Sequence, residues 1–120
     1  MTTQVTETGQ VLNHHLQALG AGKLDEILED YVEDSVLIMP DATIKGRDGI
    51  RAVFEGFLSD LFKPGTYEFA LDTRSLEGAV AYIIWHAKCA SADIVFATDT
   101  FIVKGGKIAV QTFAAKIVPR

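Results

Sequence analysis

The sequence predicts an α+β fold in which three N-terminal helices pack on one strongly curved antiparallel sheet. Two observations support this class. Hydrophobic residues recur at helical spacing before Pro64 and follow strand-like patterns after it. The later apolar segments are joined by short links, which are typical of hairpins. A chain of 120 residues with 48% hydrophobic residues fits a single compact domain, residues 1–120.

Three hydrophobic stripes predict the helices. The first covers residues 11–19 and is closed by Gly20 and Gly22, since glycine tolerates the left-handed conformation at a helix C-terminus. The second covers residues 24–31, where apolar residues recur at i, i+3, i+4 and i+7 beside an acidic face. The third covers residues 50–62, has the widest apolar stripe, and ends at the proline and glycine that follow it.

Six strands are expected. Two short ones, at residues 36–39 and 43–45, lie between the second and third helices. Four longer ones follow the third helix, at residues 67–76, 80–89, 94–104 and 107–118. The long strands are apolar on both faces, and the helices can cover only one of them. We therefore expect a second copy of the chain to cover the other face, in a homodimer.

Composition excludes several classes of partner. Eleven Lys and Arg residues against 16 Asp and Glu residues give a net charge of −5, which argues against a nucleic-acid surface and a polybasic membrane anchor. Cys89 is the only cysteine, so an internal disulfide and a cysteine-rich metal site are excluded. The N-terminus lacks the basic and apolar regions of a signal peptide. We expect a cytoplasmic protein that uses no metal or other cofactor.

Asp99 differs most clearly in polarity from the residues around it. One face of its predicted strand carries Val95, Ala97, Phe101 and Val103, with this single carboxyl at the centre. A carboxyl in such a place loses solvation, which raises its pKa and allows it to donate a hydrogen bond or move a proton. The alternative is a structural aspartate that is bonded to a hydroxyl or a backbone amide. The residues alone leave both interpretations open.

Two histidines are candidates for proton transfer beside Asp99. His15 lies on the buried stripe of the first helix, although a lone histidine on an apolar face is more often a packed core residue. His86 and Trp85 point to opposite faces of their strand. Which of them faces the helices depends on the number of residues in the turn at 90–93, so periodicity leaves both open.

The glycine turn at residues 104–107 leaves a similar alternative for the last strand. A three-residue loop would place Gln111 opposite Asp99, whereas a two-residue turn would place Thr112 there. The chain contains no HExxH or GxSxG motif and no cluster of metal ligands.

Three segments carry a resemblance to a known family. Residues 18–25 (ALGAGKLD) resemble the family's link between the first two helices, and residues 46–50 (GRDGI) resemble its approach to the third helix. Residues 98–108 (TDTFIVKGGKI) resemble its last hairpin. The family is the NTF2-like superfamily, which includes SnoaL-like proteins and ketosteroid isomerases. The resemblance implies a cystatin-like α+β cone with an apolar pocket between helices and sheet, a fold that carries many unrelated functions.

The resemblance implies roles for three residues. Asp99 falls where ketosteroid isomerases keep a protonated aspartate in the oxyanion hole. His15 falls where they carry the tyrosine hydrogen-bond donor. Met39 falls where they carry the aspartate general base, and a thioether cannot abstract a proton. Steroid isomerisation by that mechanism is therefore not expected here.

The resemblance also implies which side chains line the pocket. An ungapped match points His86 inward and favours the three-residue glycine turn with Gln111 facing the pocket. The second helix is expected to contribute Tyr31. The expected pocket residues are Tyr31, Met39, Phe54, Phe57, Tyr82, Ile84, Phe101, Gln111 and Phe113.

Two classes of function follow. The first is binding of a small apolar or carbonyl-containing molecule with cofactor-free acid–base chemistry of the isomerase, dehydratase or cyclase type. Asp99 would polarise or protonate the substrate oxygen, and His15 or His86 would move the proton. The second is a module of the same fold without turnover, which binds a small ligand or acts through dimerisation.

Overall fold

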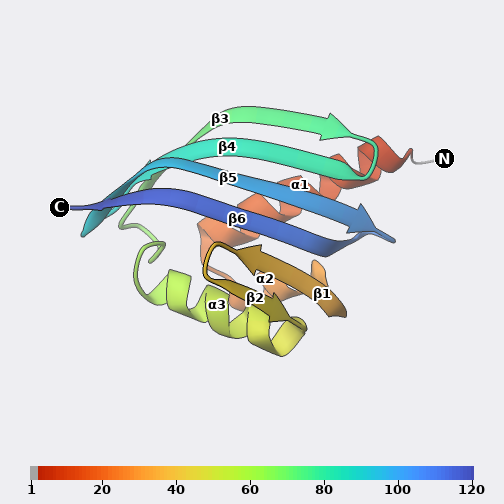
Figure 1. Ribbon diagram of the computed structural model, residues 1–120, viewed down its shortest axis with the longest axis horizontal. Coiled ribbons are helices and arrows are strands. Elements are labelled where there is room, and N and C mark those ends of the chain that lie inside the picture. Colours follow the sequence, from red (N-terminus) through yellow and green to blue (C-terminus); the bar gives the residue numbers. More distant parts are fainter. Residues whose placement is uncertain (1–2) are drawn as a thin grey trace.

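The computed structural model describes residues 3–120 (Figure 1). The helices are α1 (Gln4–Ala21), α2 (Leu24–Leu28) and α3 (Arg47–Ser59). The strands are β1 (Tyr31–Met39), β2 (Ala42–Lys45), β3 (Glu68–Glu77), β4 (Val80–Lys88), β5 (Ala92–Lys104) and β6 (Lys107–Pro119). Each predicted helix and strand is therefore present, with differences at its ends.

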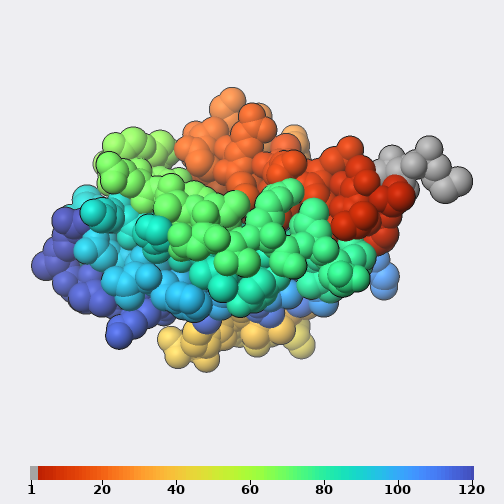
Figure 2. All heavy atoms as spheres, turned by 90° about the horizontal axis from the view of Figure 1, so that it is seen from above, coloured from red at the N-terminus to blue at the C-terminus, as the bar shows by residue number. Residues whose placement is uncertain are grey.

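All strands belong to one curved sheet of order β2-β1-β6-β5-β4-β3. Strands β3 to β6 form the predicted antiparallel meander. Strand β1 pairs with β6 in parallel, which was not predicted. The helices lie on one side of the sheet, and α1 crosses behind the strands and contacts β3, β4 and β5 (Figures 1 and 2). The α+β class, with helices packed on a curved sheet, is confirmed.

The second helix is shorter than the sequence predicts. It ends at Leu28, and Tyr31 already pairs with Ile108 of β6. An irregularity in the pairing follows, where the Ser35 hydroxyl accepts the Val32 backbone N–H at 2.9 Å and donates to the Ile108 carbonyl at 2.6 Å. Tyr31 matches the helical stripe by spacing, but this pairing with a strand 77 residues later in the chain places it in β1.

The core lies between the helices and the concave face of the sheet. Its largest fully buried side chains include Leu12 of α1, Tyr31 of β1, Ile50 of α3 and Phe101 of β5. Burying an apolar side chain of this size stabilises the fold by about 1.5–3 kcal/mol. Within residues 3–120, no helix is long and apolar enough to cross a membrane.

Candidate functional site

A cavity of about 100 Å³ lies between α1, α3 and the concave face of strands β1 and β3 to β6. Aromatic rings form most of its wall. They belong to Phe54, Phe57, Phe62, Tyr67, Phe69, Trp85, Phe101 and Phe113. Gly20 and Phe69 are exposed, so the cavity reaches the surface near these two residues. The only side chains in the wall with ionisable or amide groups, apart from Tyr67, are His15, Asp99 and Gln111.

Asp99 is buried in this wall, with 6% of its surface exposed. It pairs with Ile83 of β4 and Phe113 of β6, so all three point to the concave face. The Trp85 indole N–H donates to Asp99 Oδ1 at 2.7 Å, and the Gln111 amide Nε2 donates to Asp99 Oδ2 at 2.9 Å. The Tyr31 hydroxyl in turn donates to Gln111 Oε1. Three side chains from three strands thus hold the carboxyl in place.

Burial raises the pKa of Asp99 to about 6, and the hydrogen bonds from Trp85 and Gln111 oppose this rise. Burial disfavours the charged form because it removes water, whereas both donors favour the carboxylate. At neutral pH the carboxylate form therefore predominates, and it gains protons only as the pH falls through 6. Asp99 can thus accept or release a proton near neutral pH.

His15 lies in the same wall, on α1, and 2% of it is exposed. Its ring meets the rings of Tyr31, Phe54 and Phe101 edge-on, with centroids 5.2–6.2 Å away. Burial, with a smaller effect from His14, lowers the pKa of His15 to about 4, so the imidazole is neutral at pH 7. Its Nδ1 has no hydrogen-bond partner within the described chain. Asp99 takes its hydrogen bonds from Trp85 and Gln111, and His15 is not among its partners.

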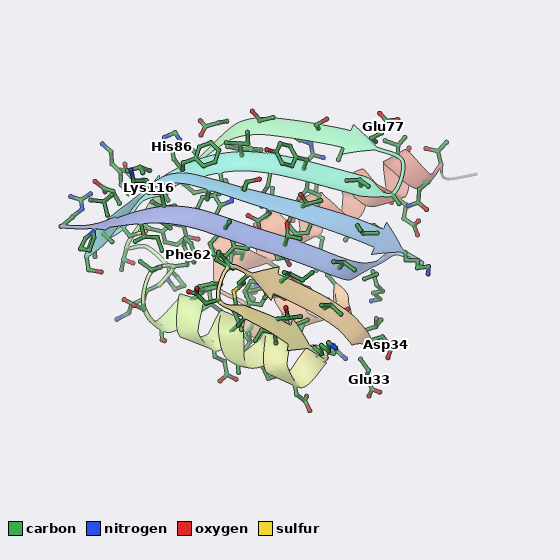
Figure 3. All side chains as sticks on the ribbon, viewed as in Figure 1. Glu33, Asp34, Phe62, Glu77, His86 and Lys116 are labelled. Carbon is green, nitrogen blue, oxygen red and sulfur yellow. The ribbon has the colours of Figure 1, made fainter. Side chains whose placement is uncertain are left out.

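The expectation that His86 faces the pocket is wrong. Trp85 points inward, and His86 is exposed on the face that the helices leave uncovered, where its Nδ1 lies 2.7 Å from Asp72 Oδ2 (Figure 3). A bulge in β5 causes the change, because Trp85 pairs with Ala97 while Ala87 pairs with Ile94. The extra residue in β5 reverses the alternation, which an ungapped match cannot detect.

The same reversal means that two other residues expected to line the pocket lie outside it. Tyr82 and Ile84 share the outer face with His86 and do not line the cavity. Met39 packs at the edge of the core and is also absent from the cavity wall. Tyr31 comes from β1 and not from a helix, and it lies behind Gln111.

The expected residues Phe54, Phe57, Phe101, Gln111 and Phe113 all lie in the cavity wall. The glycine turn nevertheless differs from the expected three-residue loop. Lys104 pairs with Lys107, so the turn has two residues, and both glycines have positive φ. A bulge follows in β6, because Val103 pairs with Ile108 while Ile102 pairs with Val110. This bulge keeps Gln111 on the concave face, diagonal to Asp99.

Trp85 and Ile83 are the lining residues of β4 that the sequence alone did not assign. One sequence signal could have identified them. Val95 and Phe96 are two consecutive apolar residues near the start of a strand that otherwise alternates, which is compatible with a bulge at this point. Phe62, Tyr67 and Phe69 also line the cavity, from the segment between α3 and β3 and from the start of β3. Within residues 3–120, no three His, Cys, Asp or Glu side chains gather in the geometry of a metal site.

Comparisons with known proteins give a family and a fold. The family model described as the SnoaL-like domain matches residues 12–111. No curated protein matches the sequence. An NTF2-like protein of unknown function from Mesorhizobium loti has a TM-score of 0.80 at 16% identity, over 97% of this chain and 96% of that chain.

Two further solved structures carry activities in their names. A candidate ketosteroid isomerase from Kribbella flavida has a TM-score of 0.79 at 15% identity, over 95% of this chain and 81% of that chain. An LEH-like epoxide hydrolase from Mycobacterium tuberculosis has a TM-score of 0.75 at 15% identity, over 93% of this chain and 84% of that chain. Such low identities show a shared fold, the NTF2-like cone, and assign no activity. Because the family model spans most of the sequence, the chain belongs to the SnoaL-like domain family of the NTF2-like superfamily.

Proposed function

We propose that this protein, as one domain, binds a small and mostly apolar molecule in the cavity beside Asp99. The observation that carries the proposal is the combination of an aromatic wall with two buried ionisable groups, Asp99 and His15. A plain core would have apolar side chains at these positions, since buried polar groups cost free energy unless they are fully bonded. His15 Nδ1 lacks such a bond within the described chain.

The volume of the cavity limits the size of the ligand. It holds about 100 Å³, whereas pockets for drug-sized molecules typically measure about 300–1,000 Å³. An engineered apolar cavity of about 150 Å³ binds benzene. The ligand class is therefore a compound with one ring or a short chain.

Binding is tested through Trp85, which is the only tryptophan of the chain and lies in the cavity wall. We expect its fluorescence to change on titration with monocyclic alcohols, ketones and amines. Leu19→Phe should abolish the change, because Leu19 lines the cavity and the larger ring would fill it. Leu58→Phe, on α3 and outside the wall, is the matched control and should bind normally. A response that persists in Leu19→Phe, or that no compound produces, would contradict the proposal.

Acid–base chemistry without a cofactor is a second candidate, and the pKa of Asp99 favours it. A value of about 6 suits a group that exchanges protons near neutral pH. Asp99 would then act alone, since His86 lies outside the cavity. His15 is not hydrogen-bonded to Asp99, and its pKa of about 4 makes it a weak base. Deuterium exchange at the α-carbon of cyclohexanone, monitored by NMR in D₂O, tests this candidate. Exchange equal in wild type and Asp99→Asn would reject it.

We also propose that the outer face of the sheet forms a homodimer of a cytoplasmic protein. Large apolar side chains are exposed on β4, β5 and β6; those on the outer face are Val80, Tyr82, Val95, Phe96, Ile102 and Val118. A stable interface should bury on the order of 1,000 Å² or more. Nucleic acid and membranes are not expected among the partners, given the net charge of −5.

Phe96→Lys is expected to weaken the dimer by at least about tenfold, since a buried aromatic anchor would become a charge. Phe96 is 51% exposed in the single chain. Sedimentation at micromolar concentration measures the effect. Val5→Lys is the control, because Val5 is exposed on α1 away from the outer face of the sheet. A monomeric wild type, or equal effects of the two variants, would rule the interface out.

A further inference from the structure

Asp99 is a buried acceptor without a countercharge. The indole N–H of Trp85 can only donate, so Asp99 Oδ1 accepts, and Oδ2 accepts from the Gln111 amide. Both donors are neutral. Asp99 takes part in no ion pair within residues 3–120, and the cavity wall contains no Lys or Arg.

The other titratable groups around Asp99 do not balance its charge. His15 of α1 is neutral because burial holds its pKa at about 4. The hydroxyls of Tyr31 in β1 and Tyr67 before β3 are neutral too, because burial raises their pKa. Helix α3 contributes Phe54 and Phe57 to the wall, which carry no charge. The carboxylate of Asp99 is therefore uncompensated at neutral pH.

The aromatic wall around this carboxylate suits a cation. Trp85 and Phe113 are stacked, with ring centroids 6.0 Å apart and planes at 14°, and Phe62 lies 5.7 Å from Trp85. Faces of aromatic rings attract cations, and tryptophan does so most strongly. Each oxygen of Asp99 keeps acceptor capacity after its one hydrogen bond. An ammonium group would therefore find a countercharge, an acceptor and aromatic rings in the wall of one cavity.

We propose that the ligand of this cavity is a small protonated amine, whose ammonium group pairs with Asp99 and whose single ring or short chain contacts the aromatic wall. The inference rests on the proposed binding function and narrows its ligand class. A carboxylate ligand would meet repulsion from Asp99, and a neutral ligand would leave the buried charge unpaired, which is costly. The net charge of −5 also attracts cations to the protein.

Three probes that share a ring and differ in charge test the proposal: benzylamine, benzyl alcohol and benzoate. Trp85 fluorescence gives the affinity of each for the full-length protein. At pH 7.5 we expect benzylamine to bind at least tenfold more tightly than benzyl alcohol, and benzoate not to bind. Propylamine and 1-propanol repeat the comparison for a smaller ligand.

Two further arms assign the preference to Asp99. Asp99→Asn should bind the amine and the alcohol about equally, while Asp93→Asn, which removes the same charge from the surface, should keep the preference. In the wild type, lowering the pH from 7.5 to 5 should weaken amine binding by about tenfold, since Asp99 then becomes mostly protonated while the amine stays charged. This arm needs no variant to fold.

The outcomes separate this inference from the function on which it rests. An alcohol that binds as tightly as the amine, or an amine affinity that is unchanged at pH 5 or in Asp99→Asn, would overturn the amine proposal and leave the binding function intact. A lack of binding by every probe would overturn both.

Discussion

Asp99→Asn is expected to change the stability of the fold in a pH-dependent way. The free energy of unfolding of the variant minus that of the wild type should be about 2 kcal/mol larger at pH 7.5 than at pH 4.5. The folded pKa of Asp99 is raised to about 6 from 3.8, so the folded state binds the proton more tightly than the unfolded state. This contribution favours folding below the unfolded pKa and is lost as the pH rises through the folded pKa.

Urea unfolding of both proteins at the two pH values measures this gain. Every other group titrates alike in wild type and variant, so the difference isolates Asp99. We expect near equality at pH 4.5, where the protonated carboxyl resembles an amide, and a more stable variant at pH 7.5. If this difference is instead smaller at pH 7.5 than at pH 4.5, the wild-type fold stabilises Asp99 in its ionised form, and the expectation is wrong.

Trp85→Phe is expected to destabilise the fold by about 2–3 kcal/mol at pH 7.5, because a hydrogen bond to a charged group is lost. The variant keeps an aromatic ring beside Phe113 and removes the N–H that donates to Asp99 Oδ1. The carboxylate then loses one of its two donors, so the pKa of Asp99 should rise further. The loss should be smaller at pH 4.5, where Asp99 is protonated.

Thermal or urea unfolding measures this effect. It is monitored by circular dichroism, because the variant has no tryptophan whose fluorescence could be used. Phe113→Leu is the matched control: it removes packing from the same wall and breaks no hydrogen bond of Asp99, so its cost should not depend on pH. Equal losses for Trp85→Phe at the two pH values would mean that the indole N–H does not support the carboxylate.

Local patterns in the sequence were sufficient to predict most of the fold. The apolar stripe of residues 50–62 predicts α3, and the short links at Gly78 and at Gly105–Gly106 predict the hairpins of the meander. Asp99 stands out because it is the one polar residue on an apolar strand face, a signal that needs no tertiary information. The resemblance to the NTF2-like superfamily is confirmed by the family match.

Long-range pairing limited the prediction of the site. An extra residue in β5 at Val95–Phe96 decides that Trp85, and not His86, faces Asp99. A second bulge in β6 offsets the short glycine turn and keeps Gln111 inward. The pairing of Tyr31 with Ile108 ends the second helix early. Bulges and parallel pairing depend on strands far apart in the sequence, so local periodicity cannot reveal them.

The indole N–H of Trp85 is the most direct probe of the buried carboxylate. Because the chain has one tryptophan, its indole gives a single resonance in an ¹⁵N-resolved NMR spectrum, and this N–H donates to Asp99. Its chemical shift should titrate with a midpoint near pH 6 in the wild type and show no such step in Asp99→Asn. An indole resonance that stays constant between pH 4.5 and pH 8 in the wild type would contradict a titrating carboxylate in this cavity.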